Sequence, residues 1–338
     1  MRGLAALLLG AFACAWLSPA MARDLRGSGS SFAFPVMASW THAYEAATSE
    51  HVTYQPIGSA AGVTEIQEGV TDFGISDAPL VDAQLVRDGL MQFPLVIGGI
   101  VPVVHLDGIG PGQLRLTGEV LADIYLGRVN RWNDPAIVAL NPGLTLPKLP
   151  ILAVHRSDGS GTTFNFADYL GKASPAFQAT VGAGTGVSWP TGVGAKGNGG
   201  VAAAVTSVKG ALGYLEFSYA ARANMAYALV RNRSGAYVTP SADSFRAAVA
   251  GVDWMREPDF HILVTDAAPA DAYPIVATSF ALLRAYPRDR AAAGRLMAFF
   301  QWTLEHGQGL AEQAGYLPLP EGLVAQVKAA WAAVGRRS

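Results

Sequence analysis

Three short stretches of the sequence combine glycine with small hydroxyl residues and stand where helices are expected to begin. They are residues 27–32 (GSGSSF), 58–62 (GSAAG) and 158–164 (DGSGTTF). The first turn of a helix has free N–H groups and a partial positive charge, and glycine or serine lets an oxyanion approach them closely. One such cluster alone is commonly just a helix cap. Three of them in one chain predict a cage for a single small anion.

An arginine and an aspartate stand beside the third cluster. Arg156 ends the apolar run at residues 151–154 and precedes Asp158 by two positions. A strand over this run would deliver the guanidinium to the start of the following helix. The planar guanidinium matches two oxygens of a tetrahedral anion, and Asp158 is close enough in sequence to orient it. The alternative is an ordinary surface arginine at the end of a strand.

Asp77 adds a carboxylate after a short apolar stretch and before the turn at Pro79. In a plain turn this residue would need no further explanation. Beside a bound anion a carboxylate is repulsive unless the ligand donates a proton to it. Asp77 therefore predicts selection of a protonated oxyanion, which includes phosphate and excludes sulfate.

Other chemistries lack a matching pattern. The six histidines have no metal-binding spacing, and no serine–glycine cluster fits G-x-S-x-G. Residues 192–197 fit the dinucleotide pattern G-x-G-x-x-G, but residues 189–191 (WPT) precede them instead of a hydrophobic strand. We therefore predict a protein that is not an enzyme and has neither a metal nor a cofactor.

The elements that must position these residues alternate between strands and helices, which indicates an α/β fold. Strands are expected at residues 52–57, 93–105, 151–156 and 275–283. Helices are expected at residues 60–68, 119–126, 162–170, 201–208, 288–306 and 320–334. No polar linker separates two halves, so we expect the chain to cross between two lobes more than once. Residues 95–104 and 274–283 are the candidate crossing strands.

Length and composition restrict the class of protein. The chain has 338 residues, of which 51% are hydrophobic and 15% charged, with a formal net charge of -2. At about 150 residues per domain this length suggests two domains. The composition excludes a disordered chain, and the scattered basic residues give no footprint for nucleic acid.

Residues 1–22 are typical of a secretory signal peptide. Arg2 provides the positive start, residues 4–17 the apolar stretch, and residues 20–22 (AMA) a cleavage pattern, so we expect cleavage near Ala22. The apolar run falls short of the roughly 20 residues that span a membrane. Cys14, the single cysteine, lies inside this segment. Lipid anchoring at Cys14 is a minor alternative, and the main expectation is a periplasmic protein.

The sequence resembles the periplasmic phosphate-binding proteins of phosphate ABC importers, the PstS family. The resemblance runs over nearly the whole mature chain, with the family's signature segments in the family's order. These segments are residues 27–32, 54–63, 72–79, 124–132, 156–164, 189–203, 210–216 and 314–318.

The resemblance implies the two-lobed fold of type II periplasmic binding proteins, with a hinge of crossing strands and a ligand cleft between the lobes. We assign residues 23–96 together with 273–338 to lobe I, and residues 97–272 to lobe II. The resemblance also implies the ligand contacts. They are Ser31, Phe32 (through its backbone), Ser59, Asp77, Arg156, Ser160, Gly161 and Thr162, with Asp158 pairing Arg156.

The sequence departs from the family pattern at three places. Ser31 stands where threonine is frequent, Ala33 where proline is common, and residues 60–61 are Ala-Ala where Ser-Gly is common. Because Ser31 keeps the hydroxyl group, the ligand class is unaffected.

The function that the resemblance implies is capture of inorganic phosphate and its delivery to the membrane permease of a phosphate ABC transporter, by a monomer. A receptor for another protonated tetrahedral oxyanion such as arsenate is the alternative. A secreted phosphatase is a weaker one, since neither a nucleophile nor a metal pattern is found.

Overall fold

A computed structural model describes residues 23–254, 256–257 and 259–335. The expected signal peptide, its cleavage site and Cys14 lie outside these residues. Among the described residues, no helix has both the length and the apolar character needed to cross a bilayer.

A mixed sheet forms the centre of the molecule. Among the described residues it has eight strands in the order β2-β1-β3-β10-β4-β8-β6-β7, and β5 pairs separately with β9. The strands are β1 (Leu25–Gly29), β2 (Val52–Gln55), β3 (Phe73–Ser76), β4 (Leu90–Val104), β5 (Leu114–Leu116), β6 (Leu152–Arg156), β7 (Val193–Ala195), β8 (Ala211–Glu216), β9 (Ala228–Val230) and β10 (Val276–Arg284).

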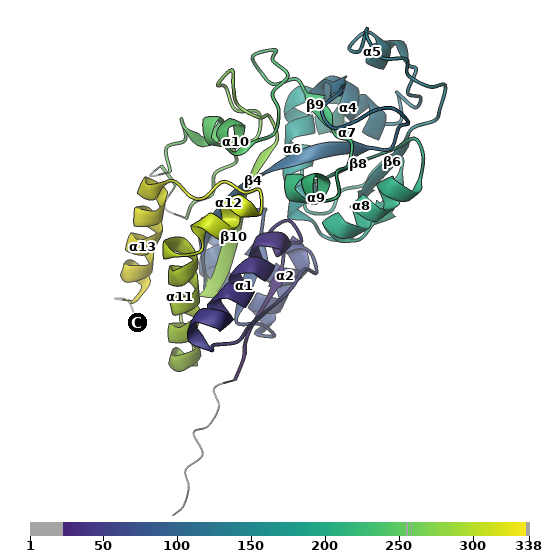
Figure 1. Cartoon of the computed structure of the whole chain (residues 1–338). Coiled ribbons are helices and arrows are strands. Elements are labelled where there is room, and N and C mark those ends of the chain that lie inside the picture. Colours follow the sequence, from purple (N-terminus) through teal and green to yellow (C-terminus); the bar gives the residue numbers. More distant parts are fainter. Residues whose placement is uncertain (1–22, 255, 258, 336–338) are drawn as a thin grey trace, which may run out of the picture.

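Helices flank this sheet along its whole length (Figure 1). They are α1 (Phe34–Thr48), α2 (Ser59–Glu68), α3 (Asp82–Asp88), α4 (Gly118–Tyr125), α5 (Pro135–Val138), α6 (Gly161–Ala173), α7 (Pro175–Thr180), α8 (Gly197–Ser207), α9 (Phe217–Arg222), α10 (Ala242–Val249), α11 (Arg290–Glu305), α12 (Gln308–Gln313) and α13 (Glu321–Gly335).

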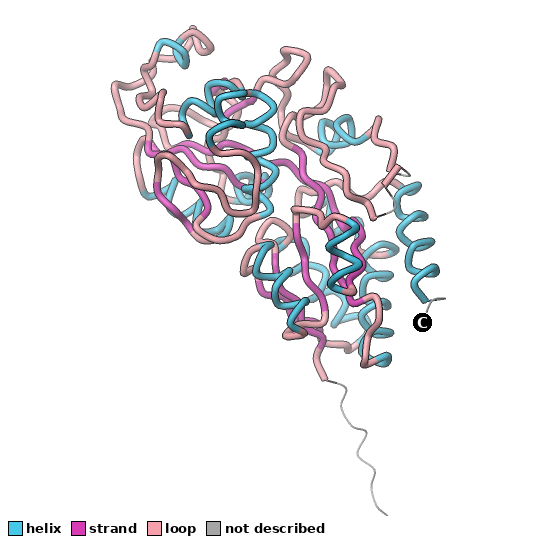
Figure 2. Tube along the Cα trace, turned by 180° about the vertical axis from the view of Figure 1, so that it is seen from behind, coloured by secondary structure: helices cyan, strands magenta, loops and turns pink. Residues whose placement is uncertain are grey.

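The long strand β4 joins two lobes. Its first part, Leu90 to Gly99, pairs antiparallel with β10, and its second part, Ile100 to Val104, pairs antiparallel with β8. In Figures 1 and 2 the strand passes from one mass of the molecule into the other. We call the part around β1, β2, β3 and β10 the first lobe, and the part around β6, β7 and β8 the second lobe. The sequence of β4 is apolar apart from Gln92, which suits a strand that is buried on both faces.

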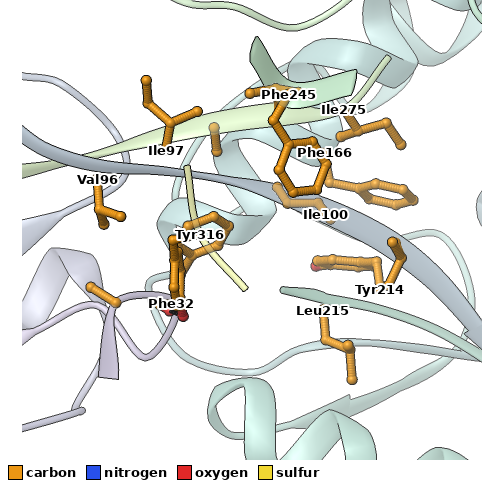
Figure 3. Close-up of a cluster of buried hydrophobic side chains, with 14 of the residues drawn as sticks. Phe32, Val96, Ile97, Ile100, Phe166, Tyr214, Leu215, Phe245, Ile275 and Tyr316 are labelled. Carbon is orange, nitrogen blue, oxygen red and sulfur yellow. Dashed lines mark hydrogen bonds between the residues drawn. The ribbon is translucent and has the colours of Figure 1, made fainter. Parts of the chain in front are cut away.

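The hydrophobic core continues through the crossing (Figure 3). Two consecutive glycines of β4 lie at this point. A Cβ atom at Gly98 would come within 2.8 Å of the Phe32 ring, and one at Gly99 within 2.4 Å of the Phe245 ring. Successive residues of a strand face opposite sides, so the glycine pair admits an aromatic ring on each face of the crossing strand.

The expected elements agree with the structure, with three corrections. Residues 27–29 of the first glycine–serine cluster belong to β1, and α1 begins only at Phe34. Ser59 is the first residue of α2 and Gly58 is its N-cap, so Ser59 does not cap that helix. The prediction of a second crossing strand at residues 274–283 is wrong: among the described residues, β10 pairs with β3 and with the first part of β4, both in the first lobe.

Candidate functional site

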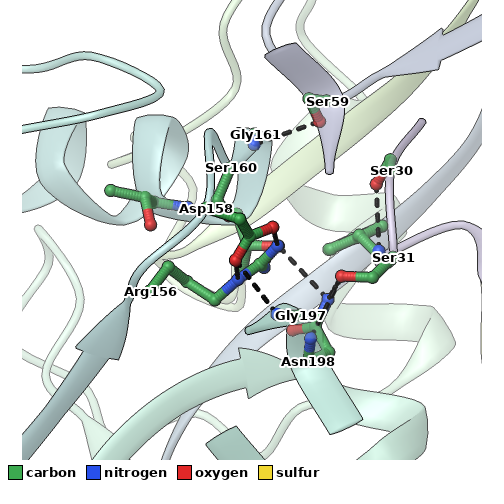
Figure 4. A network of polar contacts seen from close by, with 12 residues as sticks. Ser30, Ser31, Ser59, Arg156, Asp158, Ser160, Gly161, Gly197 and Asn198 are labelled. Carbon is green, nitrogen blue, oxygen red and sulfur yellow. Dashed lines mark hydrogen bonds and ion pairs between the residues drawn. The ribbon is translucent and has the colours of Figure 1, made fainter. Parts of the chain in front are cut away.

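The second and third clusters meet directly between the lobes. The Ser59 Oγ, at the start of α2 in the first lobe, accepts a hydrogen bond of 3.0 Å from the N–H of Gly161, at the start of α6 in the second (Figure 4). The N–H of Ala60 donates to the carbonyl of Gly159 at 3.0 Å. The starts of two helices therefore face one another, as the sequence predicts.

Glycine is required for this close approach. A Cβ atom at Gly161 would lie 2.6 Å from the Ser59 Oγ and 2.7 Å from the Asp77 Cβ. One at Gly159 would lie 2.4 Å from the Ala60 Cβ. At Gly159 and Gly161 the second lobe thus approaches the first with its main chain, and a Cβ atom at either position would hold the lobes apart.

Arg156 reaches this junction from the end of β6, as the sequence predicts. Its Nε and Nη2 donate to the two carboxylate oxygens of Asp158 at 2.7 and 2.5 Å, and its Nη1 donates to the Thr162 Oγ1 at 3.3 Å. The side chain is 1% exposed. Burial alone would raise the pKa of Asp158, but the hydrogen bonds and charge of Arg156 hold it below its ordinary value. Asp158 thus remains ionised and fixes the guanidinium.

Asp77 is buried on the other side of the junction. Its Oδ2 accepts a 2.6 Å hydrogen bond from the Ser30 hydroxyl, and its Oδ1 accepts one of the same length from Ser279 in β10. Burial raises the pKa of the carboxyl from 3.8 to about 6, although these hydroxyls and the charge of Arg156 oppose the rise. A carboxylate oxygen has more than one lone pair, so Asp77 can still accept a further proton donor.

A fourth helix start completes the network. Asn198, at the start of α8, donates from its backbone N–H and from its side chain to the Ser31 Oγ, both at 3.0 Å. The same amide lies 3.3 Å from the Thr162 Oγ1. The neighbouring Gly197 N–H donates to Asp158 at 3.0 Å. Asn198 therefore links a hydroxyl of the first lobe to one of the second.

The residues predicted for the site lie in one buried network, with different degrees of involvement. Ser160 caps α6 by accepting from the Thr163 N–H at 3.0 Å. The Phe32 N–H donates to the Ser30 Oγ at 2.9 Å, while its ring packs in the core. The predicted residues that are buried polar groups are Ser31, Ser59, Asp77, Arg156, Ser160 and Thr162.

Sequence reasoning missed several members of the network, among them Ser30, Asn198 and Ser279, and also Asn165, whose side chain donates to the Asp77 carbonyl at 2.7 Å. Ser279 carries a readable signal, since it is a polar residue in the middle of an apolar run, and a buried hydroxyl needs a partner. Asn198 directly follows the stretch 192–197, which resembles a dinucleotide motif. The structure places this stretch across β7 and the start of α8, so it is another glycine-rich helix start like those of α2 and α6.

The network occupies the space between the lobes. A cavity of about 720 Å³ lies elsewhere, in the first lobe, and Asp72, Arg284 and Trp331 contribute to its wall. Among the described residues, no group of three histidine, cysteine, aspartate or glutamate residues is arranged to hold a metal ion. What the junction offers is a buried set of N–H, hydroxyl and guanidinium donors, together with one carboxyl that is easily protonated. These groups suit a small oxyanion.

Two α/β lobes joined by a crossing strand, with donors for an anion where they meet, define a solute-binding protein of the periplasmic binding protein class. The family model described as "PBP superfamily domain" matches residues 18–306. The chain is 49% identical over 308 residues to the phosphate-binding protein PstS of Xylella fastidiosa (strain 9a5c), which covers 91% of this chain and 85% of the relative. It therefore belongs to the PstS family of phosphate-binding proteins.

Two further comparisons agree with this family and with this fold. The phosphate-binding protein PstS of Pasteurella multocida (strain Pm70) is 43% identical over 326 residues, covering 96% of this chain and 95% of the relative. A solved high affinity periplasmic phosphate-binding protein with bound phosphate is 20% identical, covers 91% of this chain and 93% of its own, and superposes with a TM-score of 0.72. At that identity the second similarity concerns the fold.

Proposed function

We propose that this chain is an extracytoplasmic receptor that captures inorganic phosphate and delivers it to the permease of an ABC importer. Membership of the PstS family supports this function. The observation that carries it is the presence of a fixed cation, Arg156, and a buried carboxyl that can accept a proton, Asp77, in one network of helix starts. A protonated tetrahedral anion satisfies both groups at once.

The proposed ligand groups divide between the lobes. From the first lobe, Ser31, the Phe32 N–H, Ser59 and Asp77 would contact the anion. From the second lobe, Arg156, Ser160, Gly161 and Thr162 would do so, with Asp158 holding the guanidinium. A bound phosphate would exchange inter-lobe bonds such as Gly161 to Ser59 for bonds from both partners to its own oxygens. Each hydrogen bond to a charged ligand contributes about 1.5 to 3 kcal/mol.

The proposed lobe boundaries are residues 23–96 with 273–338 for one lobe and 97–272 for the other. They are supported by the change of partner along β4, which pairs with β10 up to Gly99 and with β8 from Ile100. Opening would then bend the molecule at this point.

The proposed location is the periplasm, after removal of a signal peptide near Ala22. We also propose that the protein binds and releases its ligand without breaking or forming covalent bonds. Incubation of the purified protein with a phosphomonoester tests the second point, because a receptor releases no inorganic phosphate and a phosphatase does.

Isothermal titration of ligand-stripped protein with phosphate, arsenate and sulfate tests the function. We expect tight binding of phosphate, measurable binding of arsenate, and no binding of sulfate at the same concentrations. A protein that binds none of the three anions would contradict the proposal.

A further inference from the structure

Three tyrosine hydroxyls hold three consecutive carbonyl groups of the loop between β1 and α1. Tyr54 donates to the carbonyl of Ser30 at 2.8 Å, Tyr219 to that of Ser31 at 2.8 Å, and Tyr316 to that of Phe32 at 2.6 Å. The tyrosines come from β2, from α9, and from the segment after α12. Parts of the chain that are distant in sequence therefore converge on one loop.

Holding a carbonyl also fixes the next N–H, because both belong to one planar peptide group. The three tyrosines thus orient the N–H groups of Ser31, Phe32 and Ala33. Those of Phe32 and Ala33 point to the Ser30 Oγ, at 2.9 and 3.4 Å. A hydroxyl that accepts two N–H groups directs its own hydrogen elsewhere, and for Ser30 the acceptor is Asp77. The loop conformation and the carboxyl of the site are therefore linked.

One of the three bonds crosses between the lobes. Tyr54 belongs to the first lobe, as the loop does, and the segment of Tyr316 is bridged to the first part of β4 through Leu317 and Ile97. Tyr219 belongs to α9, which follows β8 in the second lobe. Only the Tyr219 bond therefore depends on the two lobes being together.

The Tyr316 hydroxyl has one hydrogen and two near acceptors, with the Ser218 hydroxyl as a more distant third neighbour at 3.5 Å. The Phe32 carbonyl is at 2.6 Å and the Glu216 Oε2 at 3.1 Å (Figure 3 shows Tyr316 beside Phe32). If the hydrogen goes to the nearer carbonyl, two oxygens with lone pairs face each other at 3.1 Å unless the Glu216 carboxyl is itself protonated. A protonated Glu216 donates to Tyr316, and both contacts become hydrogen bonds.

The surroundings of Glu216 favour the protonated form. The residue is 0% exposed, and burial raises the pKa of its carboxyl to about 8. The Ser218 N–H and hydroxyl donate to the carboxyl and oppose this rise, as does the bond from Tyr316. The titratable groups that act on it are Tyr219, Tyr316 and the exposed Arg222.

We propose that Tyr54, Tyr219 and Tyr316 are positioning residues of the phosphate site. Tyr219 acts only when the lobes are closed. Glu216 holds the proton that directs the Tyr316 hydroxyl to the carbonyl of Phe32. This inference rests on the proposed function. None of these four side chains needs to touch the ligand. They hold the loop that carries Ser31 and Phe32.

Replacing one hydroxyl at a time separates the roles. Tyr219→Phe should increase the rate of phosphate dissociation roughly three- to tenfold, the effect of one neutral hydrogen bond. The association rate of this variant should be unchanged, because capture occurs with the lobes apart.

Tyr54→Phe should instead slow association, because the Tyr54 bond orders the loop in the open form. Tyr286→Phe, at an exposed tyrosine of the first lobe, is the matched control and should change neither rate.

Two substitutions of Glu216 test the proton. Glu216→Gln keeps an N–H donor for Tyr316 and should keep the wild-type affinity at pH 6 to within about twofold, whereas Glu216→Ala should lose roughly three- to tenfold. Ionisation of Glu216 would draw the Tyr316 hydrogen away from Phe32. The affinity of the wild type should therefore fall relative to Glu216→Gln as the pH rises through about 8. A purely structural role gives no such pH dependence.

Equal dissociation rates in the wild type and in Tyr219→Phe would overturn the Tyr219 role. A pH-independent ratio of affinities would overturn the Glu216 role. Amide exchange of Ser31 in ligand-stripped Tyr54→Phe gives a separate readout, since release of the Ser30 carbonyl should speed exchange of the N–H in the same peptide group. If the wild type fails to bind phosphate, the proposed function is wrong, and the exchange rates still decide whether the tyrosines hold the loop.

Discussion

The two sides of the junction each hold a carboxyl, buried at Asp77 and partly buried at Asp158, and the two carboxyls have opposite pKa shifts. Asp77, in the first lobe, has neutral hydroxyl donors around it, and burial raises its pKa to about 6. Asp158, in the second lobe, is paired with the Arg156 guanidinium on two oxygens, which lowers its pKa. One lobe therefore provides an acid that can exchange a proton, while the other provides a permanent ion pair. A protonated anion between them meets both kinds of group.

The largest expected effect comes from removing the cation on the Asp158 side. Arg156→Ala should weaken phosphate binding by roughly 100-fold or more, because it leaves Asp158 unpaired beside an anion and removes a charged donor. Arg156→Lys, which keeps the charge and loses the two-pronged contact, should fall between this variant and the wild type. Titration calorimetry of both variants is the measurement. Near-wild-type affinity of Arg156→Ala for phosphate would contradict the claim that the second lobe supplies the cation that binds the anion.

The raised pKa of Asp77 should make the stability of the protein depend on pH. A carboxyl with a higher pKa in the folded than in the unfolded chain binds more protons when folded, so the free energy of unfolding falls as the pH rises from about 4 to about 6. The difference between 3.8 and about 6 corresponds to about 3 kcal/mol. Asp77→Asn should remove this part of the pH dependence.

Urea unfolding of ligand-stripped protein at pH 4.5 and at pH 7 measures the effect. The loss of stability between the two pH values should be smaller in Asp77→Asn than in the wild type. Asp158→Asn is the comparison, since Asp158 contributes stability above its ordinary pKa and loses it at lower pH. Identical pH dependence in the wild type and in Asp77→Asn would contradict the assigned shift.

Contact between the two sides depends on Gly161. Gly161→Ala places a methyl group within 2.7 Å of the Asp77 Cβ. Crowding of this kind costs about 1 to 3 kcal/mol, and we expect it to appear as weaker phosphate binding, because the lobes cannot close fully. Gly143→Ala, where a Cβ atom meets nothing within 4 Å, is the matched control. Equal binding by both variants would show that this contact is not needed.

The smallest effect is expected at Asn198, which bridges the two sides. Asn198→Ala removes the side-chain donor to Ser31 and Thr162, while the backbone donor to Ser31 remains. Affinity for phosphate should fall roughly three- to tenfold, with the preference over sulfate unchanged because Asp77 is intact. A loss of that preference in competition titration would mean that Asn198, too, distinguishes the anions.

The sequence was sufficient for the second-lobe side and insufficient for parts of the first. Arg156, Asp158 and the start of α6 are neighbours in the chain, so a strand followed by a helix brings them together without long-range information. The surroundings of Asp77 are assembled from distant segments, with Ser279 lying 202 positions away. Strand pairing across β3, β10 and β4 decides that contact, and local patterns do not encode it. Asn198 was missed because its glycine-rich approach resembled a nucleotide motif.

The most direct test of the account is the selectivity of Asp77→Asn. Competition titrations of phosphate against sulfate at pH 7 should show strong discrimination in the wild type. In Asp77→Asn the discrimination should be reduced, because an amide no longer repels an unprotonated anion and can donate to it. Unchanged discrimination in a folded Asp77→Asn protein would contradict the claim that this carboxyl recognises the proton of the ligand.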